Sequence, residues 1–181
     1  LSPLGSKAPL RVAGNLPYNI SSQIFFRLID AYRESGLFRD ATLMVQREVA
    51  DRIAAAPGSG EYGVLTISVQ LHADVQRLLT LPPGAFRPPP KVHSAVVRLS
   101  FRPPAVALAD ERVFVAMVRS MFTQRRKTLA NALGPFAGSR GDDARQALRA
   151  AGIDQTRRPE TLQLPELARL ADYFVRLPPL I

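Results

Sequence analysis

The sequence contains no cysteine, so the chain can form neither a disulfide framework nor a thiolate metal site. Its two histidines, His72 and His93, are too few and too far apart in the sequence for a histidine-based zinc site, and we expect both to be packing or surface residues. No stretch approaches the roughly 18 consecutive apolar residues of a transmembrane helix, and no signal-peptide pattern opens the chain. These absences predict a soluble, cytoplasmic protein with no metal ion and no membrane partner.

Acidic residues are also scarce relative to basic ones. The 181 residues include 24 Lys+Arg and 15 Asp+Glu, which gives a net charge of +9. A basic surface suits a polyanionic partner, most simply a nucleic acid. The alternative is a compositional bias toward arginine, because only Lys7, Lys91 and Lys127 are lysines. The hydrophobic share of 46% is ordinary for a globular protein with a buried core.

The first hundred residues alternate between strand and helix patterns. Leu10–Gly14 and Ala41–Val45 read as short buried strands, and each is followed by a helical pattern, at Ile20–Ala31 and Arg47–Ala56. This alternation predicts an α/β fold with a mostly parallel sheet. Ser21 and Ser22 stand where the N-cap of the first helix is expected.

The rest of the chain changes character near residue 103. Gly63–Leu71 fits a strand or a helix, whereas 75–81 and 92–101 read as strands on either side of a stiff, proline-rich loop. After residue 103 the pattern is helical, with helices expected at 111–122, 126–133, 142–151 and 165–176. We therefore predict two domains, residues 1–102 (α/β) and 103–181 (helical).

The segment Asn15-Leu16-Pro17-Tyr18 directly follows the first predicted strand. The Asn15 side-chain oxygen can accept a hydrogen bond from an exocyclic amine, and Tyr18 offers a face for stacking. Pro17 favours an extended conformation at Leu16, which can turn the Leu16 carbonyl toward the same place. The segment therefore suits a flat, amino-bearing nucleobase. The alternative is an ordinary turn at the end of a strand, because asparagine and proline are common turn residues.

Phe86 is an aromatic residue in the proline-rich loop, and the cations Arg87, Lys91 and Arg98 follow it in the sequence. A stiff loop presents such a ring at low entropic cost. Without other information, Phe86 is as well explained by packing into the core.

Two further segments carry charge. Arg125, Arg126 and Lys127 are consecutive cations at the start of a predicted helix, where they can bind phosphates or simply face solvent. Arg47 and Glu48 follow the second predicted strand at the end where α/β sheets place ligands, although we favour pairing with their neighbours.

These segments, in this order, resemble the ribosomal RNA adenine dimethyltransferase family, and most of all its bacterial small-subunit (16S) branch. The resemblance extends from about residue 10 to about 175. Its motifs are NLPYNIS at 15–21, MVQREVADRI at 44–53, the stretch from Glu61-Tyr62-Gly63, FRPPPKVHSAVVRL at 86–99 and FTQRRKTLANALG at 122–134.

The resemblance implies an enzyme that uses S-adenosyl-L-methionine to dimethylate N6 of two adjacent adenosines in small-subunit rRNA, within a 30S pre-ribosomal particle. The catalytic segment would be Asn15, Leu16, Pro17 and Tyr18. Within it, the Asn15 side chain and the Leu16 carbonyl would accept the N6 hydrogens, and Asn15 would also border the cofactor site. Tyr18 and Phe86 would stack on the adenine. The resemblance further implies that the cations Arg87, Lys91, Arg125, Arg126 and Lys127 contact rRNA.

The sequence departs from the family in lacking a G-x-G-x-G loop and an acidic residue after a first strand, the elements that hold the cofactor. The family places them several dozen residues before its NLPY motif. We therefore expect the C-terminal half of a Rossmann-like methyltransferase domain, followed by a small all-helical domain, in a fragment that does not methylate alone. His93, where relatives carry Asp or Asn, is a smaller departure.

Two other functions stay open. One is the resistance-type methyltransferase that acts on large-subunit rRNA, and the other is a non-catalytic rRNA-binding or assembly factor. We also expect the 10–14 strand to have an unpaired, apolar edge that favours self-association.

Overall fold

A computed structural model of the chain describes residues 9–175, which form two compact units. The first unit contains the described residues up to Ala54 together with Ser68–Pro104. The second contains Ala55–Ile67 together with the described residues from Ala105 onward. Residues 55–67, which the sequence interpretation assigned to the α/β part, thus group with the helical part.

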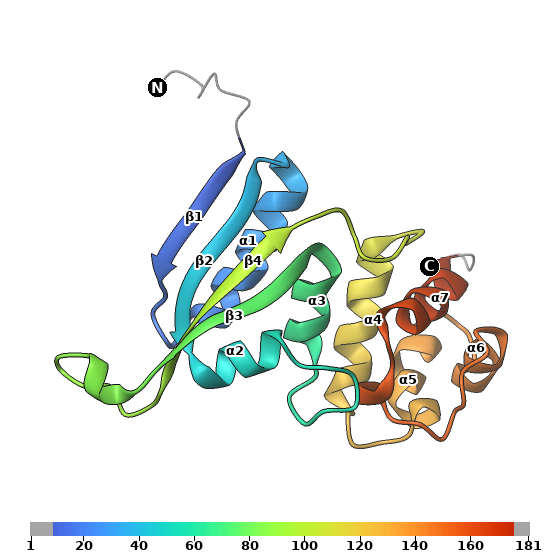
Figure 1. The fold of residues 1–181 in the computed structure, drawn as a ribbon. Helices are drawn as coiled ribbons and strands as arrows, with labels where there is room; N and C mark the ends of the chain where they lie inside the picture. Colours follow the sequence, from blue (N-terminus) through green and yellow to red (C-terminus); the bar gives the residue numbers. More distant parts are fainter. Residues whose placement is uncertain (1–8, 176–181) are drawn as a thin grey trace. The chain divides into compact units, whose positions relative to one another are not determined.

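The first unit is built on a four-stranded sheet with the order β1-β2-β4-β3 (Figure 1). Its strands are β1 (Leu10–Asn15), β2 (Phe38–Gln46), β3 (Ala73–Leu81) and β4 (Ser94–Phe101). β1 and β2 are parallel, whereas β4 is antiparallel to both β2 and β3. The expected α/β class is confirmed, but the expectation of a mostly parallel sheet is wrong for the described residues. The proline-rich loop joins β3 to β4 as a hairpin, and a hairpin makes its two strands antiparallel.

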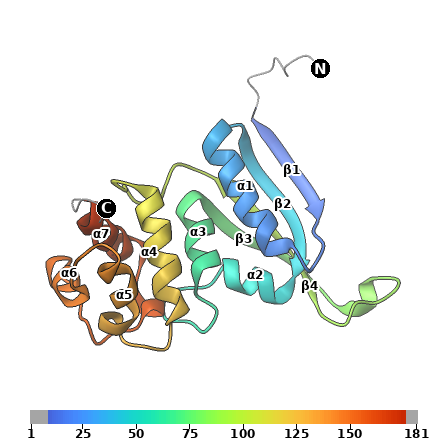
Figure 2. The same ribbon diagram turned by 180° about the vertical axis from the view of Figure 1, so that it is seen from behind.

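Helices cover one face of this sheet. Figure 2 shows α1 (Ser21–Ser35) in front of β2. Side chains alternate between the two faces of a strand, so every second residue of β2 and β4 is buried beneath the helices. The buried apolar residues are Ala41, Leu43, Val45, Ala95, Val97 and Leu99. On the opposite face Met44 and Val96 are half-buried.

The N-cap of α1 differs from the expected one. Ile20, not a serine, occupies the N-cap of α1, and the Ser21 hydroxyl instead donates to the Tyr18 carbonyl at 3.3 Å. The helix ends at Gly36, whose φ of 62° lets its N–H reach the Tyr32 carbonyl at 2.7 Å. α2 spans Arg47–Ile53, and the ambiguous segment 63–71 forms a helix, α3 (Val64–His72).

β1 was expected to be buried, and in the structure it is mostly exposed. Leu10 is 43% exposed, and only Val12 among the β1 residues is half-buried. Within the described residues β1 pairs with β2 alone, so its other edge has no partner strand there. Self-association through this edge stays a prediction.

The second unit is helical, as the sequence predicted. Its helices are α4 (Glu111–Thr123), α5 (Leu129–Gly138), α6 (Ala144–Ala150) and α7 (Leu164–Val175). Asp110 and Asp143 cap α4 and α6 by accepting backbone N–H bonds through their side chains. The rings of Phe136 and Phe174 meet edge to face at 5.2 Å in the core.

Tyr62 joins the segment 55–67 to this helical core. Its side chain is 1% exposed, and its ring lies 6.3 Å from that of Phe122. Burial, together with the negative charge of Glu166, raises the pKa of Tyr62 to about 12. None of the helices in the described part of the chain is both long and apolar enough to span a bilayer.

Candidate functional site

An open cavity of about 360 Å³ lies in the first unit, at the carboxyl ends of β1 and β2. It is lined by Asn15, Leu16, Pro17, Tyr18, Met44, Phe86, Pro88 and Pro90. The structure therefore brings together the segment Asn15–Tyr18 at the end of β1 and the aromatic residue of the proline-rich loop, about 70 positions further along the chain. Figure 1 shows this loop extending from the sheet on the side where β1 ends.

The sheet topology explains this meeting. β1 and β2 are parallel, so their carboxyl ends lie at the same end of the sheet, and Asn15 pairs with Met44. β4 is antiparallel to β2 and therefore begins at the same end of the sheet, where Ser94 pairs with Gln46. The residues that follow β1 and β2 and those that precede β4 are thereby brought close together.

The Asn15–Tyr18 segment is held in place by hydrogen bonds to its neighbours. The Leu16 N–H donates to the Met44 carbonyl at 2.9 Å, and the Leu16 side chain is only 8% exposed. The Tyr18 hydroxyl lies 2.8 Å from the Ser94 Oγ. Asn15 is exposed and Tyr18 is half-buried, so both remain accessible from the cavity.

Phe86 sits at the end of a short 3-10 turn, η1 (Pro83–Ala85), in the β3–β4 loop. The Phe86 N–H donates to the Pro83 carbonyl at 3.2 Å, which fixes the backbone just before the ring. The ring is half-buried and lines the cavity, so it does not plug the core. The cavity therefore has an aromatic residue from each of two separate segments.

The charged residues that the sequence analysis named near this site lie in different places. Arg87 and Lys91 are exposed on the loop that carries Phe86. Arg98 lies in the middle of β4, opposite Thr42, and is not among the residues that line the cavity. Glu48 pairs with Arg52 at 2.5 Å on α2, as the favoured interpretation expected.

A second cavity, of about 600 Å³, lies in the second unit. It is lined by Thr123, Gln124, Arg125, Arg126, Lys127 and Glu160. The expectation that the cations open a helix is wrong, because α5 begins only at Leu129. They follow the C-terminus of α4, where the helix dipole favours positive charge.

The three cations are not equivalent. The Arg125 Nη2 donates to the Gly60 carbonyl at 2.6 Å and to the Ser59 carbonyl at 3.4 Å, so Arg125 holds the segment 55–67. The same segment is held a second time by the Gly58 N–H, which donates to the Glu160 carbonyl at 2.6 Å. Arg126 and Lys127 are exposed. Two of the three cations thus face solvent, and one has a structural contact.

Backbone carbonyls occupy the N-terminus of α5. Thr128 is its N-cap residue but makes no side-chain capping bond. The Leu129 N–H donates instead to the Arg157 carbonyl at 2.7 Å, and the Ala130 N–H donates to the Gln155 carbonyl at 3.2 Å. This helix start is therefore satisfied by the protein's own backbone.

Sequence reasoning missed Met44, Ser94 and Glu160 as members of these sites. Met44 and Ser94 stood within quoted motifs, but only strand register brings them to the site. No local signal marks Glu160, which reaches the second cavity from the 3-10 turn η2 (Pro159–Thr161). The described residues contain no group of three or more His, Asp or Glu side chains that could hold a metal ion.

Comparisons with known proteins give consistent results. The ribosomal RNA adenine dimethylase family matches residues 4–175. Proteins named ribosomal RNA small subunit methyltransferase A match at 49% identity in Geobacter sulfurreducens, covering 90% of this chain and 58% of that protein, and at 46% in Syntrophotalea carbinolica, covering 90% and 61%.

Solved structures with a similar fold include the following two. A dimethyladenosine transferase from Plasmodium falciparum superposes with a TM-score of 0.74 at 26% identity, covering 88% of this chain and 64% of that one. The 23S rRNA methyltransferase ErmE gives a TM-score of 0.61 at 25% identity, with coverage of 93% and 66%. The chain spans about 60% of the length of the curated relatives it matches.

Proposed function

Because the chain belongs to the ribosomal RNA adenine dimethylase family, we propose that its complete protein dimethylates N6 of two adjacent adenosines in small-subunit (16S) rRNA. The substrate would be a 30S pre-ribosomal particle in the cytoplasm, and the reaction would serve ribosome biogenesis. The relatives named small subunit methyltransferase A, at 46% to 49% identity, support this rRNA target.

The observation that carries the proposal is the cavity shared by Asn15–Tyr18 and Phe86. An adenine drawn out of its stack would lie between the rings of Tyr18 and Phe86, which suits a base that must be flipped to be modified. The Asn15 side-chain oxygen and the Leu16 carbonyl would accept the two N6 hydrogens.

These two acceptors also account for activation of the amine. The N6 lone pair of adenine is delocalised into the ring, which makes it a poor nucleophile. Hydrogen bonds to both N6 hydrogens favour a pyramidal nitrogen with a more available lone pair. The contribution of these residues is therefore positioning and polarisation of the acceptor, without a general base.

S-adenosyl-L-methionine would supply the electrophilic methyl group. Of the described residues, Asn15 is the one that we assign to the edge of its site. The sequence has no G-x-G-x-G loop, so the residues present fit the methyl acceptor and do not by themselves form a donor site. The residues of this chain would therefore bind, orient and polarise the adenosine.

The exposed cations supply a surface for the rRNA backbone. Arg126 and Lys127 border the second cavity, and Arg87 and Lys91 lie on the loop that carries Phe86. Phosphate contacts of this kind give affinity and position the RNA without reading its sequence.

The test is transfer of labelled methyl groups by the complete protein to small subunits that lack this modification. Asn15→Ala should reduce the rate by about 100-fold or more, the usual cost of removing one positioned polar group at a reacting centre. Asn19→Ala is the matched control, because Asn19 lies four residues away, in the turn after β1, and does not line the cavity. Absence of methylation of small subunits by the unaltered protein would refute the proposal.

The same assay separates the second candidate, methylation of large-subunit rRNA. The fold similarity to the 23S rRNA methyltransferase ErmE favours testing it. Labelling of free 23S rRNA in preference to the small subunit would establish that activity. RNA binding without labelling of either substrate would instead support a non-catalytic assembly factor.

A further inference from the structure

The Tyr18 hydroxyl and the Ser94 Oγ lie 2.8 Å apart, which joins two segments separated by 76 residues. Ser94 is 0% exposed, whereas Tyr18 is half-buried and lines the first cavity. A buried hydroxyl thus contacts the outer end of a ring whose face is accessible.

Ser94 has little freedom to move. It is the first residue of β4 and pairs with Gln46 of β2 on one side and with Leu81 of β3 on the other. The carbonyl of the preceding residue, His93, accepts the Arg47 N–H at 2.9 Å at the start of α2. The backbone that carries the Ser94 hydroxyl is therefore held by three elements of the first unit, β2, β3 and α2.

The backbone of Tyr18 is held separately. Its carbonyl accepts the Ser21 hydroxyl at 3.3 Å, and the Pro17 carbonyl accepts the Ile20 N–H at 3.3 Å. These bonds fix where the side chain starts, but they leave its two torsions free. The bond to Ser94 fixes the far end of the ring and thereby the direction in which the side chain extends from Cα.

We propose that Ser94 is a positioning residue for the base site, acting by holding the ring of Tyr18 in the orientation that stacks on the adenine. The inference rests on the proposed role of Tyr18 in binding the base. A ring held in its bound orientation loses less side-chain entropy when the base arrives, so binding is tighter and better aligned.

A merely structural role for Ser94 makes a different prediction. A buried hydroxyl that serves the fold lowers stability when it is removed. The Tyr18 hydroxyl belongs to a half-buried residue, so water can replace Ser94 as its partner, and loss of the bond should change ring orientation more than stability.

The first experiment is a double-mutant cycle on methylation by the complete protein. Ser94→Ala and Tyr18→Phe should each lower kcat/KM by about three- to tenfold, the effect of one neutral hydrogen bond. The kcat/KM of the double variant should be no lower than that of the less active single variant, because both substitutions remove the same bond. Losses that multiply in the double variant would overturn the proposal.

Ser94→Thr and Ser100→Ala complete this series. Ser94→Thr keeps the hydroxyl and should restore most of the activity. Ser100 is exposed on the same face of β4, six positions away, so Ser100→Ala should have no effect. Loss of activity in Ser94→Ala that is matched by an equal loss in Ser100→Ala would also count against positioning by Ser94.

The second experiment does not depend on methylation. The chain has four tyrosines, so 3-fluorotyrosine labelling gives four fluorine resonances, and the one missing in Tyr18→Phe belongs to Tyr18. In Ser94→Ala this resonance should shift, whereas those of Tyr32, Tyr62 and Tyr173 should not. An unchanged Tyr18 resonance would show that Ser94 does not hold the ring.

Tyr18→Ala separates this inference from the proposed function. Full methylation by Tyr18→Ala would refute base binding by Tyr18, and the role of Ser94 with it. Loss of methylation in Tyr18→Ala, with normal kinetics and an unchanged Tyr18 resonance in Ser94→Ala, would refute the role of Ser94 alone.

Discussion

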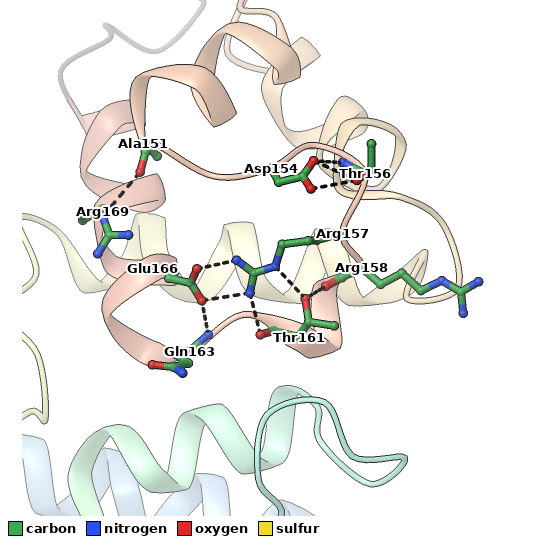
Figure 3. Close-up of polar contacts among 9 residues, drawn as sticks. All are labelled: Ala151, Asp154, Thr156, Arg157, Arg158, Thr161, Gln163, Glu166 and Arg169. Carbon is green, nitrogen blue, oxygen red and sulfur yellow. Dashed lines mark hydrogen bonds and ion pairs between the residues drawn. The ribbon is translucent and has the colours of Figure 1, made fainter.

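Arg157 and Glu166 form an ion pair with two bonds, Nη1 to Oε1 at 2.6 Å and Nη2 to Oε2 at 3.1 Å (Figure 3). Arg157 also donates to the Thr161 carbonyl and hydroxyl, and Glu166 accepts the Gln163 N–H at 2.9 Å. The pair thus fixes the loop that contains Gln155 and Arg157, whose carbonyls accept the first N–H groups of α5. α5 in turn follows the exposed cations Arg126 and Lys127 in the sequence.

Removing the charge of Glu166 should destabilise the second unit. Glu166→Gln should lower the free energy of unfolding by about 1–2 kcal/mol, because it weakens hydrogen bonds between charged groups. Amide hydrogen exchange should also become faster at Leu129 and Ala130, whose partners lie in the loop. Glu48→Gln is the control, since the exposed pair with Arg52 should cost only about 0.3–0.5 kcal/mol. Equal losses in the two variants would contradict a special role for Glu166.

The contribution of Glu166 should depend on pH. The hydrogen bond from Arg157 lowers the pKa of Glu166 below its ordinary value of 4.5. A carboxyl with a lowered pKa in the folded state stabilises the protein above its unfolded pKa, and this stabilisation is lost as the pH falls through the folded pKa. The stability difference between the unaltered chain and Glu166→Gln should therefore be constant above about pH 5.5 and shrink below pH 4.5. Urea unfolding at a series of pH values measures this, and a difference that grows with acidity would contradict it.

Phe86 should matter for binding the base and not for stability. Phe86→Ala should weaken adenosine-dependent binding or kcat/KM by about ten- to a hundredfold, because stacking on one base is worth about 1–3 kcal/mol. Leu79→Ala provides the control, since Leu79 is 57% exposed on the neighbouring β3 and does not line the cavity. A melting temperature that falls in Phe86→Ala while kcat/KM stays unchanged would instead assign Phe86 to the core.

The three consecutive cations should differ in how much each contributes to the salt dependence of RNA binding. Replacing both Arg126 and Lys127 with Gln should reduce the slope of log K against log salt by about 1.4–1.8, because two phosphate contacts are lost. Arg125→Lys keeps the charge but loses the Nη2 that donates to the Gly60 and Ser59 carbonyls, so the slope should stay the same. Hydrogen exchange at the Gly58 amide should become faster in Arg125→Lys and not in the double variant. Arg125→Gln removes the charge, and a slope that falls by about 0.7–0.9 in this variant would show that Arg125 binds a phosphate like its neighbours.

Local patterns in the sequence predicted most of the elements correctly. The apolar spacing of 111–122 and 165–176 matches α4 and α7 closely, because these helices bury one face against their neighbours and that face repeats with the helical period. Asn15, Tyr18 and Phe86 were singled out because an amide acceptor and two aromatic rings suit a flat, amino-bearing base. The prediction that they share one cavity came from the family resemblance, since no local pattern relates residues so far apart.

Other features had no local signal. The grouping of residues 55–67 with the helical unit depends on Tyr62, Gly58 and Arg125, whose partners are distant in the sequence. The exposed environment of β1 was also missed, because an apolar run looks the same whether or not a neighbouring strand covers it.

The sequence by itself determined which groups are available to this protein: amide and carbonyl acceptors beside two aromatic rings, a surplus of arginine, and no cysteine. Residue types carry this chemistry, and their spacing determines where helices and strands form. Only the tertiary structure decided which groups meet. The antiparallel register of β4 with β2 sets the buried Ser94 beside Tyr18, and the end of α4 turns Arg125 toward Gly60 while Arg126 and Lys127 face solvent. Such contacts depend on strand pairing and helix ends that join residues far apart, and no window of the sequence contains both partners.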